Sequence, residues 1–187
     1  MDKTKDKIMM LLLLPLLFFI ALTGWRVDFF RLLDSVSGEV LFASPAALGH
    51  KFTTRYIHSV ELTPVEDEYY VVDGKLWSWE ERVRSSKAGM PSVRPEYGRY
   101  IENDQWMIYQ GGRLSWETFY YRIGNEHLGL NQSSFEPFGR RNFYEIFRGR
   151  KLSVSVYKAP FLYSSVRFAN SLMYAPEGVP AVERRTR

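Results

Sequence analysis

The strongest structural signal in this sequence is Tyr69-Tyr-Val-Val-Asp-Gly-Lys-Leu-Trp-Ser-Trp79. Two runs rich in aromatic and β-branched residues flank the dipeptide Asp73-Gly74. A two-residue Asp-Gly loop between such runs is typical of a β-hairpin, because both turn positions then adopt a positive φ. The stretch therefore predicts two antiparallel strands, Tyr69–Val72 and Lys75–Trp79, joined by a tight turn.

Short apolar runs broken by turn residues continue on both sides of this hairpin. A second hairpin is predicted around Gly111-Gly112, between Gln105–Tyr109 and Leu114–Tyr121. Two short helices are predicted at Asn142–Phe147 and Ala169–Tyr174. Strand runs at this spacing are typical of a compact antiparallel β-sandwich or barrel. The other predicted strands are Gly38–Ala43, Phe52–Val60, Lys151–Tyr157 and Phe161–Phe168.

The composition agrees with one folded, mainly β domain. Of the 187 residues, 45% are hydrophobic and 16% are aromatic, which suits pleated, half-buried strands. The net charge of +4 is dispersed among acidic residues, so no basic stripe is present and we expect no nucleic-acid partner. The chain has no cysteine, which excludes disulfides, thiolate metal sites and cysteine nucleophiles.

The amino-terminal segment has the character of an export signal or membrane anchor. Residues 8–22 contain no polar side chain and follow three lysines within the first seven residues. Residues 8–25 reach the lower limit of about 17 residues for crossing a bilayer, with Trp25 placed for its interface. We expect one transmembrane or signal helix in residues 1–26, and hence a single-pass protein of the cell membrane with its body on the extracytoplasmic side.

Two alternatives to this anchor stay open. A cleaved signal peptide would leave a secreted or periplasmic protein, although no Ala-x-Ala-like cleavage site follows the apolar run. A buried core helix would normally carry polar residues on one face, and this segment has none. The rest of the chain then divides into a β-rich extracytoplasmic domain at residues 27–175 and a basic carboxyl-terminal tail at residues 176–187.

The densest stretch of polar side chains runs from Arg55 to Tyr69. On an extended strand His58 and Ser59 would point to opposite faces, which argues against a Ser–His catalytic pair. The nucleophile-elbow pattern Gly-x-Ser-x-Gly does not occur in the chain. We therefore expect no catalytic residues and no enzymatic activity.

Three interpretations of this polar stretch stay open. In the structural one, Glu61 or Glu66 accepts hydrogen bonds from His58 and a turn backbone. In the second, a metal is held by His58, Glu61, Glu66 and Glu68, which His127 or His50 could join in space. The spacing of these residues matches no established metal motif, so we expect no metal and no cofactor. In the third, the stretch binds an organic ligand. A guanidinium fork for a carboxylate could come from any of four strand arginines, which could equally pair with neighbouring acids: Arg55, Arg82, Arg84 and Arg122.

The sequence Tyr56-Ile-His-Ser-Val-Glu-Leu-Thr-Pro-Val-Glu-Asp-Glu-Tyr69 resembles the hallmark of the bacterial family called domain of unknown function (DUF) 1850. Ala88-Gly-Met-Pro91 is similar to the family's Gly-x-Pro segment, and the likeness covers about residues 38–130. Genes of this family are commonly found beside those of TAXI-type TRAP transporters, which take up organic acids with an extracytoplasmic binding protein.

The resemblance implies an extracytoplasmic, membrane-anchored accessory protein of such a transporter, with its membrane or solute-binding subunits as partners. The alternative is an independent cell-surface module that binds a small ligand or a metal. The family provides no catalytic residues to carry over. The candidate ligand- or partner-binding residues are Arg55, Tyr56, His58, Ser59, Glu61, Pro64, Glu66 and Tyr69.

Overall fold

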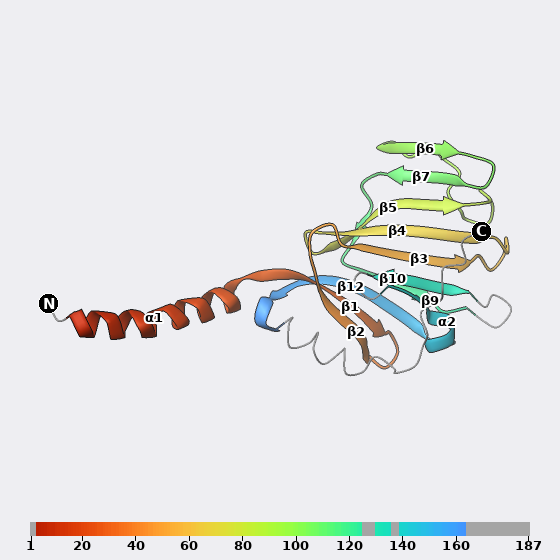
Figure 1. The fold of residues 1–187 in the computed structure, drawn as a ribbon. Coiled ribbons are helices and arrows are strands. Elements are labelled where there is room, and N and C mark those ends of the chain that lie inside the picture. Colours follow the sequence, from red (N-terminus) through yellow and green to blue (C-terminus); the bar gives the residue numbers. More distant parts are fainter. Residues whose placement is uncertain (1–2, 125–129, 136–138, 164–187) are drawn as a thin grey trace.

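The computed structural model describes residues 3–124, 130–135 and 139–163. They form an amino-terminal helix followed by two antiparallel sheets (Figure 1). The predicted mainly β, antiparallel architecture is confirmed as a sandwich-like pair of sheets. The first sheet has four strands in the order β2 (Val40–Ala46), β1 (Arg26–Asp34), β12 (Lys151–Pro160) and β9 (Thr118–Arg122).

The second sheet has eight strands and carries most of the predicted functional residues. Its order is β11 (Arg140–Asn142), β10 (Asn131–Phe135), β3 (Lys51–Ile57), β4 (Pro64–Val72), β5 (Lys75–Val83), β7 (Met107–Gly111) and β6 (Gly98–Glu102). The short strand β8 (Ser115–Trp116) also pairs with β5. A one-turn helix, α2 (Phe143–Ile146), follows β11 and is capped by Asn142, as the sequence predicts for residues 142–147.

The core lies between the two sheets and is made by alternate residues of their strands. Strand β1 contributes Phe30 and Leu32, which are buried against residues of the eight-stranded sheet. The ring of Phe30 stacks on that of Phe135, with centroids 4.1 Å apart. Other buried members of this cluster are Ala46, Phe52, Val71, Leu76, Ile123, Leu152, Val154 and Val156.

The predicted hairpin at Asp73-Gly74 is confirmed. Strands β4 and β5 pair antiparallel up to Val72 and Lys75, and the two turn residues have φ values of 49° and 74°. These positive values are what a two-residue hairpin turn with strand-matched twist requires.

The predicted hairpin at Gly111-Gly112 is wrong. Both glycines have positive φ, but β7 and β8 do not pair with each other; they follow one another along the same edge of β5. The Trp77 indole N–H donates to the carbonyl of Gly112 at 3.1 Å, which fixes the bend against β5. The chain then crosses to the other sheet, where β9 pairs with β12.

Several predicted boundaries also shift. The strand predicted for 52–60 ends at Ile57, because the chain turns there into β4. Residues 161–163 are helical rather than extended. The remainder of the predicted strand to residue 168, the helix at 169–174 and the tail at 176–187 lie outside the described residues. The sequence did not predict strands β1, β6, β10 and β11.

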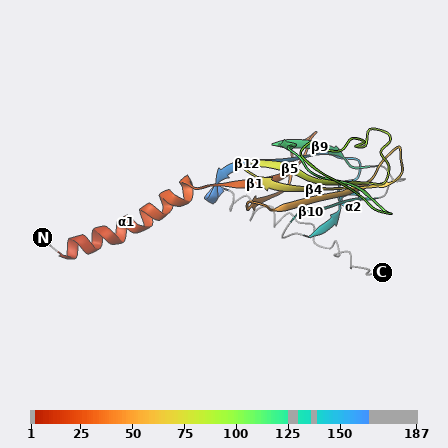
Figure 2. The same cartoon turned by 90° about the horizontal axis from the view of Figure 1, so that it is seen from above.

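Helix α1 (Lys3–Gly24) confirms the predicted amino-terminal helix, and it extends away from both sheets (Figures 1 and 2). The predicted membrane span is not found: within the described ranges, no helix is both long enough and apolar enough to cross a bilayer.

Candidate functional site

The centre of the predicted motif is the loop that joins β3 to β4. Ile57 and Pro64 are the last paired residues, and the six residues between them form the tip of the hairpin. The His58 imidazole Nδ1 accepts hydrogen bonds from the backbone N–H groups of Glu61 at 3.2 Å and Val60 at 3.4 Å. His58 therefore has a structural contact here, but its hydrogen bonds run opposite to the predicted ones. The imidazole does not donate to a glutamate; it accepts from the loop backbone and caps the loop.

The tip of this hairpin is fastened further by two backbone bonds and one side-chain bond. The His58 N–H donates to the Thr63 carbonyl at 2.8 Å, and the Leu62 N–H donates to the His58 carbonyl at 2.9 Å. The hydroxyl of Ser85, just after β5, donates to Glu61 Oε2 at 2.8 Å. Glu61 therefore ties the tip to the neighbouring loop.

Strand alternation separates the other predicted residues into two groups. Arg55 and Glu66 lie on the outer face of the eight-stranded sheet, where their side chains pair at 3.2 Å. Tyr56 and Tyr69 lie on the inner face, and Tyr69 packs against the core. Pro64 begins β4 opposite Ile57. The candidate residues therefore do not form one site.

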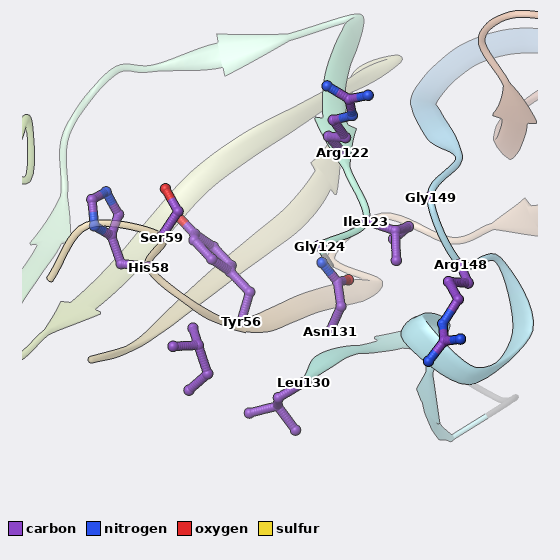
Figure 3. Close-up of a pocket in the computed structure, with 11 residues that line it drawn as sticks. Tyr56, His58, Ser59, Arg122, Ile123, Gly124, Leu130, Asn131, Arg148 and Gly149 are labelled. Carbon is purple, nitrogen blue, oxygen red and sulfur yellow. The ribbon is translucent and has the colours of Figure 1, made fainter. Parts of the chain in front are cut away.

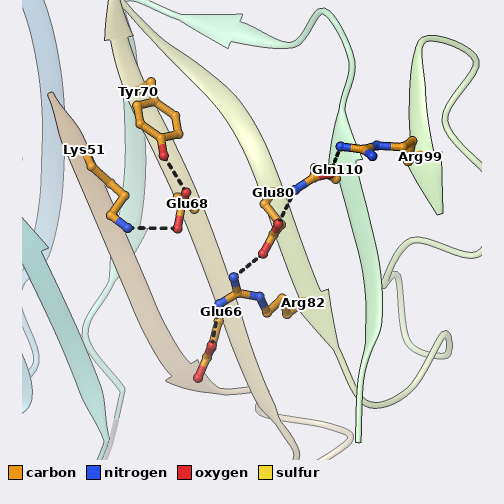
Figure 4. A network of polar contacts seen from close by, with 8 residues as sticks. All are labelled: Lys51, Glu66, Glu68, Tyr70, Glu80, Arg82, Arg99 and Gln110. Atoms are coloured by element: carbon orange, nitrogen blue, oxygen red, sulfur yellow. Dashed lines mark hydrogen bonds and ion pairs between the residues drawn. The ribbon is translucent and has the colours of Figure 1, made fainter. Parts of the chain in front are cut away.

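The outer face carries a polar network across neighbouring strands (Figure 4). Glu66 accepts from Arg82 at 3.2 Å, and Arg82 also pairs with Glu80, which accepts from Gln110 at 2.8 Å. Lys51 pairs with Glu68 at 3.3 Å in the same way. Acids and bases alternate here and neutralise one another, so this face has the character of a structural ion-pair network.

The inner face carries a cross-strand row that the sequence did not single out. Thr54, Asp67, Glu81 and Tyr109 lie opposite one another on β3, β4, β5 and β7. Burial raises the pKa of Asp67 to about 6, and burial together with the Asp67 charge raises that of Glu81 to about 7. The alternation of Val65, Asp67 and Tyr69 along the sequence is the pattern that could have indicated that Asp67 lies on the core side.

A cavity of about 730 Å³ opens beside the hairpin tip, at the end of the sandwich (Figure 3). Tyr56, His58 and Ser59 of the motif line one side of it. The other side comes from segments far away in sequence: Arg122, Ile123, Gly124, Leu130, Asn131, Arg148 and Gly149. Arg122 was among the predicted guanidinium forks, whereas the sequence did not place Asn131 or Arg148 at a binding site.

The metal interpretation required His58 to meet the carboxylates of β4, and the structure separates these groups. Glu66 and Glu68 project on the outer face and pair with basic residues there, while His58 faces its own loop. In the part of the chain that the structure describes, no three His, Asp or Glu side chains gather as a metal site. His127, a further predicted ligand, lies outside the described residues.

Comparison with known proteins gives one match. Residues 52–136 match the family whose description is domain of unknown function (DUF1850). No curated protein and no solved structure matches the chain. The matched range begins in β3 and ends just after β10, so it includes the hairpin tip, the inner polar row and most of the cavity lining. The chain therefore carries a DUF1850 domain over residues 52–136.

Proposed function

We propose that this protein is an extracytoplasmic accessory protein of a TRAP-type (TAXI) organic-acid transporter. In this role it is held at the membrane by helix α1 and contacts a membrane or solute-binding subunit of the transporter through the β3–β4 hairpin tip. The role is one of binding, without catalysis. The resemblance to the DUF1850 family points to this class of transporter, and two features of the structure support such a role.

The observation that carries the proposal is the apolar surface of α1. The helix projects from the sheets, and large apolar side chains are exposed in succession along it; Leu11 is 74% exposed and Phe18 is 66% exposed. Consecutive exposed positions lie all around a helix, so no single face of α1 packs on the sheets. Such a surface is costly in water, and lipid is the cover that an export-type segment would meet.

The hairpin tip supplies a second apolar surface suited to a protein partner. Val60 is 69% exposed and Leu62 is 68% exposed, although the loop that holds them is fixed by the His58 cap and the Glu61–Ser85 hydrogen bond. Leu62 also has a φ of 52°, a backbone conformation unusual for leucine. A rigid loop that presents apolar side chains costs little entropy on binding, which supports a docking role.

The test is a pull-down of the full-length tagged protein from a detergent extract of cells that also produce the transporter. A tip variant, Val60→Ser with Leu62→Asn, removes the apolar groups, and asparagine tolerates the left-handed backbone at this position. A matched control, Val93→Ser with Leu114→Asn, changes two exposed residues elsewhere. Mass spectrometry should show transporter subunits with the wild type and the control, and their loss with the tip variant.

Absence of transporter subunits from the wild-type preparation would exclude a stable complex, and equal recovery with the tip variant would exclude the tip as its contact. Membrane association is measured separately, by flotation of the wild type with lipid vesicles. A variant that lacks residues 1–24 should remain at the bottom of the gradient. Flotation of that variant would contradict the role of α1.

A further inference from the structure

We infer that the cavity beside the hairpin tip binds a small organic anion through its carboxylate group, with Arg122 and Asn131 as the principal contacts. Two arginines, one histidine and no acid stand among the described residues that line it. This inference concerns a ligand site and goes beyond the accessory role, so failure of the transporter complex to form would leave it unaffected.

Arg122 supplies a guanidinium that no acid among the described residues neutralises. It stands at the end of β9, opposite Lys151 of β12, and makes no ion pair with a described residue. Asp34 lines an adjoining cavity together with Arg122, but it already accepts from the backbone N–H groups of Val36 and Ser37 and pairs with Arg150 at 3.3 Å. The planar fork of an unpaired arginine matches a carboxylate in two parallel hydrogen bonds.

Asn131 supplies a second hydrogen-bonding group to the cavity. The residue is only 5% exposed, and its backbone N–H donates to the Asn142 side chain at 3.1 Å. Its own side-chain amide lines the cavity and has no hydrogen-bond partner among the described residues (Figure 3). The amide is not among the enclosed, unpaired side-chain groups of the described residues, so it is open to a molecule in the cavity. A bound carboxylate would accept from this amide.

The remaining walls set the kind of anion. Ile57, Ile123 and Leu130 provide apolar surface, and Tyr56 and Ser59 provide hydroxyl groups on the side of the hairpin. A volume of about 730 Å³ falls within the usual range for small-molecule sites. This combination suits a short hydrocarbon chain that ends in a carboxylate better than a fully hydrated inorganic ion.

Arg148 adds positive charge from the other side. Its guanidinium lies over the Tyr144 ring, 4.8 Å from the ring centroid, and donates a hydrogen bond to the hydroxyl of the same tyrosine. It is therefore held in place by α2 before any ligand arrives.

The experiment is isothermal titration and thermal unfolding of the full-length protein in detergent with succinate as the probe. The uncharged succinamide and inorganic phosphate serve as comparison ligands at concentrations up to about 10 mM, which would reveal even weak binding. Three variants are compared with the wild type: Arg122→Gln, Arg122→Lys and the charge-matched control Lys75→Gln, which lies at the opposite end of β5 from the hairpin tip.

We expect saturable binding of succinate to the wild type and to Lys75→Gln, with neither succinamide nor phosphate binding comparably. Arg122→Gln should weaken binding about tenfold or more, and Arg122→Lys should weaken it by less, because lysine keeps the charge but loses the fork.

Circular dichroism verifies that each variant is folded. If Arg122→Gln does not fold, Arg122→Lys still tests the contribution of the guanidinium fork. Equal succinate affinity in wild type and both Arg122 variants, or no succinate binding to the wild type, would overturn the inference. Tighter binding of phosphate than of succinate would overturn the carboxylate assignment.

Discussion

Asp67 and Glu81 face each other directly across strands β4 and β5, on the inner side of the eight-stranded sheet. Thr54 Oγ1 donates to Asp67 Oδ2 at 2.9 Å, whereas Glu81 has no hydrogen-bond partner among the described residues. Like charges opposite each other destabilise a strand pair, and burial adds to the penalty. Two such carboxyl groups titrate as a coupled pair, so the native state retains protons at a pH at which isolated carboxyls have lost them.

The first prediction is that this pair makes the free energy of unfolding fall as the pH rises. The pKa values of Asp67 and Glu81 are raised to about 6 and about 7, so the native state binds more protons than the unfolded chain. The stabilisation is complete below the ordinary carboxyl pKa near 4 and is lost as the pH passes through 6 and 7. Urea unfolding at pH 4.5 and pH 8 should show the wild type less stable at pH 8.

Asp67→Asn should remove much of this dependence. It keeps an oxygen that can accept from Thr54 and eliminates the charge opposite Glu81. We expect it to be more stable than the wild type at pH 8, by on the order of 1 kcal/mol, with little gain at pH 4.5. Asp104→Asn, at an exposed position, is the control. A difference between the two pH values that is unchanged in Asp67→Asn would contradict the coupling.

The second prediction concerns the cap of the hairpin tip. His58→Ala removes the acceptor of the Val60 and Glu61 backbone N–H groups and should lower the free energy of unfolding by about 1 kcal/mol. His58→Asn should lose less, because a short amide oxygen can accept from the backbone two residues further along the chain. Urea unfolding compares the three proteins. Equal stability of all three would show that the cap contributes nothing.

Local chemistry in the sequence was enough to predict some elements of the fold. The Asp73-Gly74 turn was predictable, because both residues tolerate the positive φ that a tight hairpin demands. The Gly111-Gly112 turn was not, because glycine permits a reversal without requiring one. Whether the chain reverses there depends on the free edge of β5, which β7 and β8 occupy in turn. That edge is a property of the assembled sheet.

The candidate site shows the same division. The motif itself could be found in the sequence, and its alternation explains why Arg55 and Tyr56 project on opposite faces. The cavity could not be found, because Arg122 and Asn131 reach Tyr56 only through the pairing of β10 with β3 and the crossover of the chain between the sheets. Non-local strand pairing leaves no signal in a local sequence pattern.

The third prediction distinguishes two acids of the outer network by their burial. The side chain of Glu80 is 8% exposed, accepts from Gln110 and pairs with Arg82, whereas that of Glu66 is 25% exposed. Glu66→Ala should therefore cost about 1 kcal/mol or less, and its effect should shrink in high salt. Glu80→Ala should cost about 2 kcal/mol, because it removes a buried, charged acceptor that holds both Gln110 and Arg82. Urea unfolding at low and high salt measures both, and a larger cost for Glu66→Ala would contradict this ranking.

The fourth prediction places a steric requirement at the outer edge of the eight-stranded sheet. Gly98 of β6 lies opposite Gly111 of β7, and a Cβ at Gly98 would stand 2.3 Å from the Gln110 carbonyl oxygen. A contact that short with backbone forces the two strands apart. Gly98→Ala should therefore break the β6–β7 pairing and cost about 1–3 kcal/mol.

Hydrogen exchange followed by mass spectrometry measures this effect strand by strand. Amides of β6 and β7 should exchange faster in Gly98→Ala, while those of β12 in the core of the other sheet should change less, because β6 is the last strand of its sheet. Gly24→Ala is the control, since nothing lies within 4 Å of its added Cβ. Unchanged exchange of β6 and β7 in Gly98→Ala would mean that the two strands can absorb a methyl group, and that the close approach at Gly98 is not required for their pairing.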